Sequence, residues 1–347
     1  MNALISATVV LLVSTATGWS QSLTWLGTLG GRESWAYDVS ASGSVVVGWA
    51  FNAAGAIRAF RWSAAGGMRE LGTLPGAWWS EAYGVSADGS VIVGTSYSRA
   101  FRWTEAGGMQ DLGTLPGGTW SYAYGVSADG RVVVGGARNA AGYDRAFRWE
   151  SGGMQDLGTL GGNRSEAYGV SANGSVVVGW AHNAAAWRRA FRWEDGVLRD
   201  LSTLGGTESE AYGVSANGSV VVGRDNWHGA FRWTAATGRM ENLNTTYTHL
   251  LAGGSYLERA TAISPNGRYI VGRGYNAATL RTEAFLLDTG FPLPGDVDRN
   301  GCVDDADLLM VLFAFGEPGY RNEDLNWDGT TDDADLLIVL FNFGNGC

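Results

Sequence analysis

The chain has 347 residues, of which 45% are hydrophobic, 17% are charged and 53 are glycine. This composition argues against disorder, and abundant glycine without a collagen-like triplet favours many short strands joined by turns. Lysine is absent and the formal net charge is −10, which argues against a nucleic-acid partner. Residues 295–347 carry 12 acids and 2 arginines, whereas residues 1–294 carry 22 of each, so we expect two domains with different roles.

The N-terminal segment predicts export. Residues 3–16 form an apolar run as long as that of a signal peptide, and Gly18 and Ser20 supply small residues for cleavage. No basic residue precedes the run, so a buried strand or helix is the alternative. We predict a signal peptide at residues 1–20 and a secreted or cell-surface protein. No later apolar run is long enough to span a membrane, so no membrane span is expected after cleavage.

The region from residue 22 to residue 289 contains six tandem repeats. Each begins with the pattern A-[YT]-x-[VI]-S-x-[SDN]-G, and successive copies start 41 to 49 residues apart. The copies start at Ala36, Ala82, Ala123, Ala167, Ala211 and Ala260. Valine-rich, A-F-R-W and L-G-T-L runs follow, and each is typical of a short strand. Asp-Gly or Asn-Gly pairs between two runs tolerate positive φ at both positions and predict tight hairpins. Four strands in such a period predict one blade, so we expect an all-β six-bladed β-propeller.

The two ends of the repeat region are complementary. The sixth unit ends at residues 284–287 without an L-G-T-L run, whereas residues 26–29 supply a spare one near the start. We expect this N-terminal strand to close the last blade, which would join the ends of the ring and remove an exposed sheet edge. The tryptophan of the A-F-R-W run recurs in nearly every unit and is therefore expected in the core.

The repeat units resemble a family of bacterial extracellular repeats called HAF. The matching residues are the A-F-R-W and L-G-T-L-[GP]-G blocks, as at residues 59–62 and 71–76, and the resemblance covers the repeat region. It implies an exported bacterial protein, and it implies no established activity.

Candidate binding residues on the propeller are those that vary while their neighbours do not. If the first strand of each blade is innermost, the residues before the six alanines surround the mouth of the central channel. They are Trp35, Glu81, Tyr122, Glu166, Glu210 and Arg259. The three carboxylates are candidates for binding a cation, or two of them for hydrolysing a glycosidic bond; a solvated rim of ion pairs is the alternative. Aromatic loop residues, among them Trp187 and Trp227, are candidates for stacking on a glycan or anchoring a protein, unless they only seal the packing between blades.

A linker at residues 289–295 leads into two acidic motifs that are offset by 28 residues at every position. Each matches the 12-residue EF-hand calcium loop, except that the last ligand is aspartate in place of glutamate. Positions 1, 3, 5, 7, 9 and 12 supply the oxygens, with a backbone carbonyl at position 7 and a water held by position 9. The first loop contains Asp296, Asp298, Asn300, Cys302, Asp304 and Asp307, and the second contains Asp324, Asn326, Asp328, Thr330, Asp332 and Asp335. We predict two Ca²⁺ ions and a module that folds largely on binding them, because the carboxylates of each loop repel one another without metal.

Each loop leads into an apolar run with helical spacing, at residues 308–315 and 336–343. Two loop–helix units without entering helices are similar to a type I dockerin domain, and the similarity covers residues 295–347. It implies a tether to a cohesin-like or other extracellular protein, often in polysaccharide degradation. The near-identity of the two halves implies two binding orientations related by a pseudo-twofold axis.

Both cysteines of the chain, Cys302 and Cys347, lie in this acidic region. Two thiols without nearby histidines do not make a zinc site. They either form a disulfide that fixes the C-terminus to the first loop or remain free thiols, and the geometry decides between these alternatives.

We therefore expect a secreted, non-catalytic protein whose propeller binds a glycan or a protein and whose calcium module attaches it to a partner. No G-x-S-x-G, H-E-x-x-H or phosphate-binding glycine loop occurs, so no enzymatic activity is expected. One alternative is a propeller glycoside hydrolase, using two of Glu81, Glu166 and Glu210, or an accessory protein of extracellular polysaccharide degradation. The other is a structural cell-surface protein.

Overall fold

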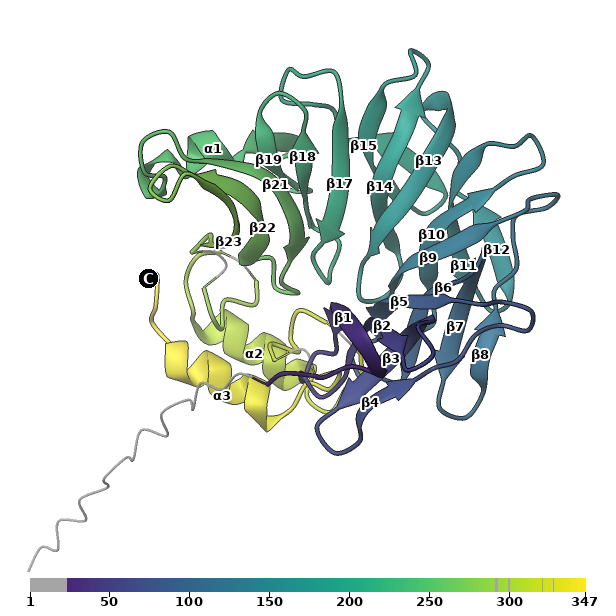
Figure 1. Ribbon diagram of the computed structural model, residues 1–347. Helices are drawn as coiled ribbons and strands as arrows, with labels where there is room; N and C mark the ends of the chain where they lie inside the picture. The colour runs from purple at the N-terminus through teal and green to yellow at the C-terminus, as the bar shows by residue number, and fades with distance from the viewer. Residues whose placement is uncertain (1–23, 291–292, 299, 320, 327) are drawn as a thin grey trace, which may run out of the picture.

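The computed structural model describes residues 24–290, 293–298, 300–319, 321–326 and 328–347, and the predicted signal peptide lies outside these ranges. Six antiparallel sheets follow one another along the chain and are arranged around a ring (Figure 1). The first five sheets have four strands each, in sequence order, and the sixth has three. The protein is therefore a mainly-β six-bladed propeller followed by short helices, as the repeats predict.

The bounds of the strands follow the repeats. Blade 1 contains β1 (Gly30–Val39), β2 (Val46–Asn52), β3 (Ile57–Ser63) and β4 (Gly67–Glu70). Blade 2 contains β5 (Ser80–Val85), β6 (Val91–Ser96), β7 (Arg99–Thr104) and β8 (Gly108–Asp111). Blade 3 contains β9 (Ser121–Val126), β10 (Val133–Arg138), β11 (Asp144–Glu150) and β12 (Gly153–Asp156). Blade 4 contains β13 (Gly161–Val170), β14 (Val176–Asn183), β15 (Arg188–Glu194) and β16 (Val197–Asp200). Blade 5 contains β17 (Ser209–Val214), β18 (Val220–Asp225), β19 (Gly229–Thr234) and β20 (Arg239–Asn242). Blade 6 contains β21 (Tyr256–Ile263), β22 (Tyr269–Asn276) and β23 (Arg281–Asp288).

The turn between the first two strands of a blade differs from the predicted hairpin. Only the glycine of the Asp88-Gly89 pair has positive φ, at 73°. The aspartate instead accepts hydrogen bonds from the Ser86 hydroxyl (2.6 Å) and from the backbone N–H of Ser90 (2.9 Å). The pair therefore belongs to a longer turn that side-chain hydrogen bonds hold in shape, as Asx turns do.

The structure also corrects the identity of the fourth strand. The L-G-T-L run at residues 71–74 follows β4 and joins no ladder, because Gly72 at φ 80° ends the extended backbone. The fourth strand is instead the preceding G-M-R-E segment. Leu71 and Leu74 are buried between blades, and the Leu71 amide donates to the Ala59 carbonyl at 2.9 Å. The run thus seals a junction between blades and does not extend a sheet.

For the same reason residues 26–29 do not close the sixth blade. They form no strand, and the Ser34 hydroxyl donates to the Gly27 carbonyl at 2.7 Å, which holds the segment against its own blade. Leu29 forms an isolated parallel β-bridge with Asn52 of blade 1. Within the described residues the sixth sheet has three strands, and residues of all three, together with residues 250–252, line a groove of about 310 Å³. The part of the chain that the structure describes therefore does not contain the predicted closing strand.

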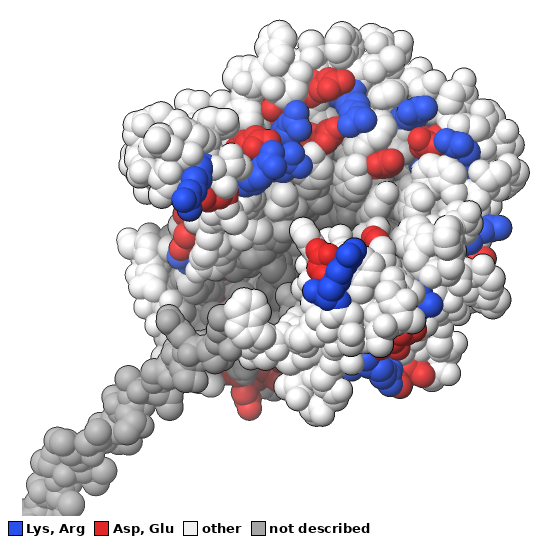
Figure 2. All heavy atoms as spheres, viewed as in Figure 1, with Lys and Arg blue, Asp and Glu red and all other residues white. Residues whose placement is uncertain are grey.

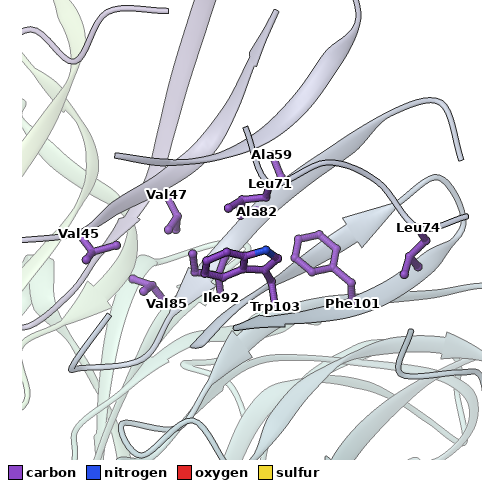
Figure 3. Close-up of a cluster of buried hydrophobic side chains, with 10 residues drawn as sticks. All are labelled: Val45, Val47, Ala59, Leu71, Leu74, Ala82, Val85, Ile92, Phe101 and Trp103. Carbon is purple, nitrogen blue, oxygen red and sulfur yellow. The ribbon is translucent and has the colours of Figure 1, made fainter. Parts of the chain in front are cut away.

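Neighbouring blades are joined by five clusters of buried apolar side chains, one at each junction from blades 1 and 2 to blades 5 and 6. Figure 3 shows the first cluster, in which Leu71 and Leu74 from blade 1 lie near Phe101 and Trp103 from blade 2. The phenylalanine of A-F-R-W is fully buried in each of the first five blades. Removal of this apolar surface from water is the main stabilising contribution at each junction.

A serine makes the same two hydrogen bonds at four junctions. Ser165 of blade 4 accepts from the Ala146 amide of blade 3 (2.9 Å) and donates to the Gly158 carbonyl (2.6 Å). Ser80, Ser121 and Ser209 repeat this arrangement.

A series of backbone hydrogen bonds also links the blades, from the Ala41 amide to the Ala87 carbonyl and onward to the Pro265 carbonyl. The series ends there because proline has no N–H to donate.

The C-terminal region is a small helical module. Its helices are α2 (Asp305–Phe313) and α3 (Asp333–Asn342), which contact each other (Figure 1). The short α1 (Leu243–Thr246) and a 3₁₀ turn at Thr248–Leu250 precede blade 6. The module contacts the propeller where the Asn217 amide donates to the Asn322 side chain at 3.0 Å. Within the described ranges, none of the helices has the length and apolar character needed to cross a membrane.

Candidate metal centre and channel rim

Both acidic loops are built around the first turn of the helix that follows them. Asp304 is the N-cap of α2 and forms a capping box with Asp307, and Asp332 and Asp335 do the same at α3. The last ligand position of each loop is thus the third residue of a helix. The Asp307 carboxylate accepts from the backbone N–H groups of Val297 (2.7 Å), Asp298 (3.1 Å) and Asp304 (2.9 Å), which brings the start of the loop back to its end.

The first loop contains a cluster that fits a hard cation. Ligand oxygens of Asp296, Asp298 and Asp307 lie within 4.8 Å of one another, and Asp296 and Asp307 are buried. One carboxylate oxygen of Asp296 is buried without a hydrogen-bond partner. Burial, and then the charges of Asp307 and Asp298, raise the pKa of Asp296. Buried carboxylates that repel one another are costly without a counter-charge, and oxygen donors of this kind suit Ca²⁺.

The other predicted ligands of the first loop are less converged. The Asn300 side-chain Nδ2 donates to Asp298 at 3.0 Å, and the Asn300 side-chain Oδ1 accepts from the Cys302 backbone N–H at 2.8 Å. Asp304 uses one oxygen to cap the helix through the Ala306 amide at 2.8 Å. Its second oxygen lies 3.5 Å from the Cys302 sulfur, and the water-mediated role of position 9 stays a prediction.

The second loop repeats the buried pair but not the triad. Asp324 and Asp335 are fully buried, and the Asp335 carboxylate accepts from the Asn326 amide (3.0 Å) and the Asp332 amide (2.9 Å). Burial raises the pKa of Asp324 to about 6, and the charges of Asp335 and Asp328 act in the same direction. Asn326 replaces the middle carboxylate and donates to Asp328 at 2.9 Å. The Thr330 amide donates to Asp328 at 3.0 Å, as position 7 does in the first loop. Among the described residues, one group of three carboxylates is close enough to hold an ion, and it belongs to the first loop.

Cys302 and Cys347 are joined by a disulfide, with their Cα atoms 4.8 Å apart. The bond attaches the C-terminus to position 7 of the first loop. Disulfides are typical of proteins from oxidising compartments outside the cytosol.

The channel rim is lined by the first strands of the blades, since these strands contact one another in turn from blade 1 to blade 6. Figure 2 shows charged side chains of both signs along the edge of the central hollow. Of the predicted rim residues, Glu81, Tyr122, Glu166 and Glu210 come from the four middle blades. Trp35 stacks on Trp49, with centroids 6.2 Å apart, and Arg259 lies 3.6 Å from Glu258.

A belt of tyrosines, each two residues after a rim residue in the sequence, was not predicted. Consecutive rings of Tyr37, Tyr83, Tyr124, Tyr168 and Tyr212 have centroids 5.4 to 5.8 Å apart. The sequence signal is the second position of the repeat, which is tyrosine in five units and Thr261 in the sixth. Aromatic rings at this distance stabilise neighbouring strands beyond their buried area, so the belt couples blades 1 to 5 around the channel.

The tyrosine belt also fixes the rim carboxylates. Glu81 accepts from the Tyr83 hydroxyl at 2.5 Å and Glu166 from the Tyr168 hydroxyl at 2.7 Å, and Glu210 accepts from Tyr212. Burial raises the pKa of Glu166. Burial also acts to raise the pKa of Glu210, but the hydrogen bonds from Tyr212 and from Arg188 (2.7 Å) outweigh it and lower that pKa. Two carboxylates in adjacent blades therefore have pKa values shifted in opposite directions.

The aromatic loop residues divide into two groups. Trp180 is buried within β14, where its indole N–H donates to the Tyr168 hydroxyl at 3.0 Å and the Arg188 guanidinium lies 4.5 Å from its ring. Trp187 and Trp227 are 46% and 67% exposed, respectively. Exposed tryptophans on loops are available to stack on a ligand, whereas buried ones are not.

The architecture defines the class of the protein, a six-bladed β-propeller, and the acidic triad adds a possible metal site. No family model matches the chain, and no curated protein matches it. A putative TolB from Agrobacterium tumefaciens is similar in structure at 17% identity and TM-score 0.46, covering 64% of this chain and 80% of its own. TolB from Acinetobacter baumannii is similar at 13% identity and TM-score 0.45, covering 76% and 62%. A chain of a nidogen/laminin complex is similar at 14% identity and TM-score 0.41, covering 69% and 92%. These similarities are low, so the propeller class rests on the six sheets themselves.

Proposed function

We propose that this chain is a secreted, non-catalytic propeller that a calcium-dependent, dockerin-like module attaches to an extracellular partner. One observation carries the proposal: α2 and α3 present the same apolar face twice. Phe313 is 85% exposed and Phe341, 28 residues later, is 83% exposed. Leu309 and Leu312 on α2 and their counterparts Leu337 and Leu340 on α3 are also exposed. Exposed apolar patches of this kind are typical of protein-binding surfaces.

Calcium is the ion that the loops suit best. Asp296, Asp298 and Asp307 would hold it in the first loop, and Asp324, Asp328 and Asp335 in the second. The bound ion would neutralise the buried carboxylates and so hold both helices in the orientation that presents the apolar face. The partner is therefore expected to be an extracellular protein domain, of cohesin or similar type, with an apolar surface.

The test uses the full chain as bait for extracellular proteins of its host, with calcium and with EGTA. If the module binds its partner in two orientations, one through each helix, then Phe313→Ala or Phe341→Ala alone should weaken capture about twofold. The other orientation remains available in each single variant. The double variant is expected to lose capture at least about tenfold. Leu280→Ala, at an exposed position of the propeller, is the control and should leave capture unchanged. Capture that resists EGTA, or that survives in the double variant, would refute the tether.

The propeller is expected to supply a second binding surface, for a glycan, at its rim and loops. Exposed Trp187 and Trp227 lie on loops that follow the second strands, and charged rim residues lie nearby in the fold. Loss of glycan binding in Trp187→Ala and Trp227→Ala, with Phe341→Ala unaffected, would support this role. Equal binding by all three variants would contradict it.

A propeller glycoside hydrolase is the second candidate function. The opposite pKa shifts of Glu166 and Glu210 favour it, because glycosidases need one protonated and one ionised carboxyl group. Glu166 would be the acid and Glu210 the base or nucleophile. Turnover on a panel of polysaccharides that disappears in Glu166→Gln would establish the enzyme, and absence of turnover leaves the binding role. A structural surface role remains if neither binding nor turnover is found.

A further inference from the structure

The two halves of the calcium module each contain a clasp, in which the chain after a helix returns to one of the loops. After α2, the Gly316 amide donates to the Thr331 carbonyl and the Gly319 amide to the Gly329 carbonyl, both at 2.8 Å. After α3, the Gly344 amide donates to the Val303 carbonyl at 2.8 Å, and the Val303 amide donates to the Asn345 carbonyl at 2.9 Å. Residues 316–319 thus hold the second loop, and residues 344–347 hold the first.

Only the clasp on the first loop is covalent. Cys347 is bonded to Cys302, whereas the residues at the equivalent positions, 28 earlier and 28 later, are Gly319 and Thr330. The fit is close, because a Cβ atom added at Gly346 would lie 2.0 Å from the Gly301 carbonyl oxygen. The disulfide therefore presses the C-terminal tail against positions 6 to 8 of the first loop.

The two clasps differ in what holds them once the disulfide is gone. Residues 316–319 lie between α2 and the second loop, so the chain keeps them in place on both sides. Within the described chain, residues 344–347 are anchored by α3 on one side, and the disulfide supplies their second covalent attachment. The Gly301 turn and the Cys302 carbonyl, which is a predicted ligand, would lose their restraint together with the tail.

On the basis of the proposed calcium function, we propose that the Cys302–Cys347 disulfide makes the first loop a redox-sensitive calcium site, while the second loop binds independently of thiol state. The disulfide preorganises the first loop before the ion arrives, so less ordering has to accompany binding. The unpartnered, buried oxygen of Asp296 points to a ligand in this loop. Reduction by a dithiol transfers two electrons and two protons to the bond, gives two cysteine thiols and leaves the dithiol as its own disulfide.

The test isolates each loop within the full chain. Asp324→Asn removes the first ligand of the second loop, and Asp296→Asn is the matched change in the first. Calcium binding is measured by titration calorimetry with calcium chloride, on oxidised protein and on protein reduced with dithiothreitol and alkylated. Reduction should weaken binding in Asp324→Asn about tenfold or more, and change it less than about twofold in Asp296→Asn.

A second route to the same comparison is Cys347→Ser, which leaves the first loop unaltered. Combined with Asp324→Asn, it should show the weaker affinity without reductant and should not respond to dithiothreitol. Equal effects of reduction on both loops, or none on the first, would overturn the inference. Oxidised wild-type protein that binds no calcium would overturn the calcium proposal itself, and this inference with it, so the two failures are distinguishable.

Discussion

The propeller and the C-terminal module are stabilised in opposite ways. Each junction from blade 1 to blade 6 buries a cluster of seven to ten residues, apart from partly buried neighbours, and every one of them is apolar. The module buries four valines in its core, and it also buries four aspartates. These aspartates are Asp296, Asp307, Asp324 and Asp335. Apolar burial stabilises a fold by itself, whereas buried carboxylates need a counter-charge, so only the module should depend on metal.

A similar contrast exists within the propeller, between its junctions and its ends. Ala59, Ala100, Ala146, Ala190 and Ala230 are fully buried, but the equivalent Ala284 in blade 6 is exposed. Blade 6 lacks a following blade to cover this face, and Pro265 cannot extend the backbone series. The same alanine position is therefore buried or exposed according to whether a neighbouring blade covers it.

Removal of calcium should give the largest separation of the two regions. Calcium at 100 times Kd raises the free energy of unfolding by about 2.7 kcal/mol per site. Two sites would therefore stabilise the module by about 5 kcal/mol and leave the stability of the propeller unchanged. Scanning calorimetry of the full chain with EGTA should show the module transition move to lower temperature while the propeller transition stays. Two transitions that both ignore the chelator would break the comparison.

The reverse experiment places the change in the propeller. Phe191 is fully buried between blades 3 and 4, so Phe191→Ala should cost about 3–5 kcal/mol. The propeller transition should fall in calorimetry, and the calcium-dependent transition should not. Leu280→Ala, at an exposed position, is the control and should change neither. A module transition that falls with Phe191→Ala would show that the two regions unfold as one unit.

The propeller also contains shielded carboxylates. Asp225 of blade 5 is buried, but it accepts hydrogen bonds from the backbone amides of Leu204, Trp227 and His228 at 2.9 to 3.0 Å. Asp38 is half-buried and stands where blades 2 to 5 have glycine. Burial raises its pKa to about 6, although the Val85 and Val39 amides oppose this. A folded-state pKa above the unfolded value stabilises the fold at low pH, and the contribution is lost as pH rises from about 4 through 6. Asp38→Asn keeps an acceptor for the Val85 amide, so it should stabilise the propeller by about 1–3 kcal/mol at pH 7.5. Denaturant unfolding should show that Asp38→Asn does not raise the free energy of unfolding at pH 4. An equal increase at both pH values would contradict the raised pKa of Asp38.

The smallest expected effect distinguishes a junction from an end. Ser165→Ala removes the acceptor of the Ala146 amide and should cost about 1–2 kcal/mol. Ser34→Ala is the equivalent change in blade 1, where the hydroxyl donates to the Gly27 carbonyl and accepts from no backbone amide among the described residues, so it should cost clearly less. Both costs can be measured from the shift of the denaturant midpoint, provided that m, the dependence of the unfolding free energy on denaturant concentration, stays the same. Equal costs would mean that blade 1 is packed like the others.

The repeats predicted the six blades because each unit carries an apolar run followed by an A-F strand, which reads A-F-R-W in the first five units and A-F-L-L in the sixth. The expected core positions of the tryptophans are confirmed at Trp103, Trp149 and Trp193, which are buried, whereas Trp62 and Trp233 are half-buried. The L-G-T-L run was assigned to the wrong role, because its leucines are buried but Gly72 prevents an extended strand. The predicted rim residues and the loop aspartates occupy positions of the expected kind, while their ligands remain predictions. The tyrosine belt was missed because one tyrosine per unit has no partner until adjacent blades meet.

The sequence by itself determined the local elements and their order. Period, turn residues and loop spacing act over a few residues, so they are legible without the fold. Only the tertiary structure decided which elements meet: the tyrosines around the channel, the three carboxylates of the first loop, and the C-terminal tail on the loop that contains Cys302. It also decided that blade 6 ends the series with an exposed face. These features depend on contacts between residues far apart in the chain, and a repeated sequence gives the same local signal whether or not a neighbour is there to cover it.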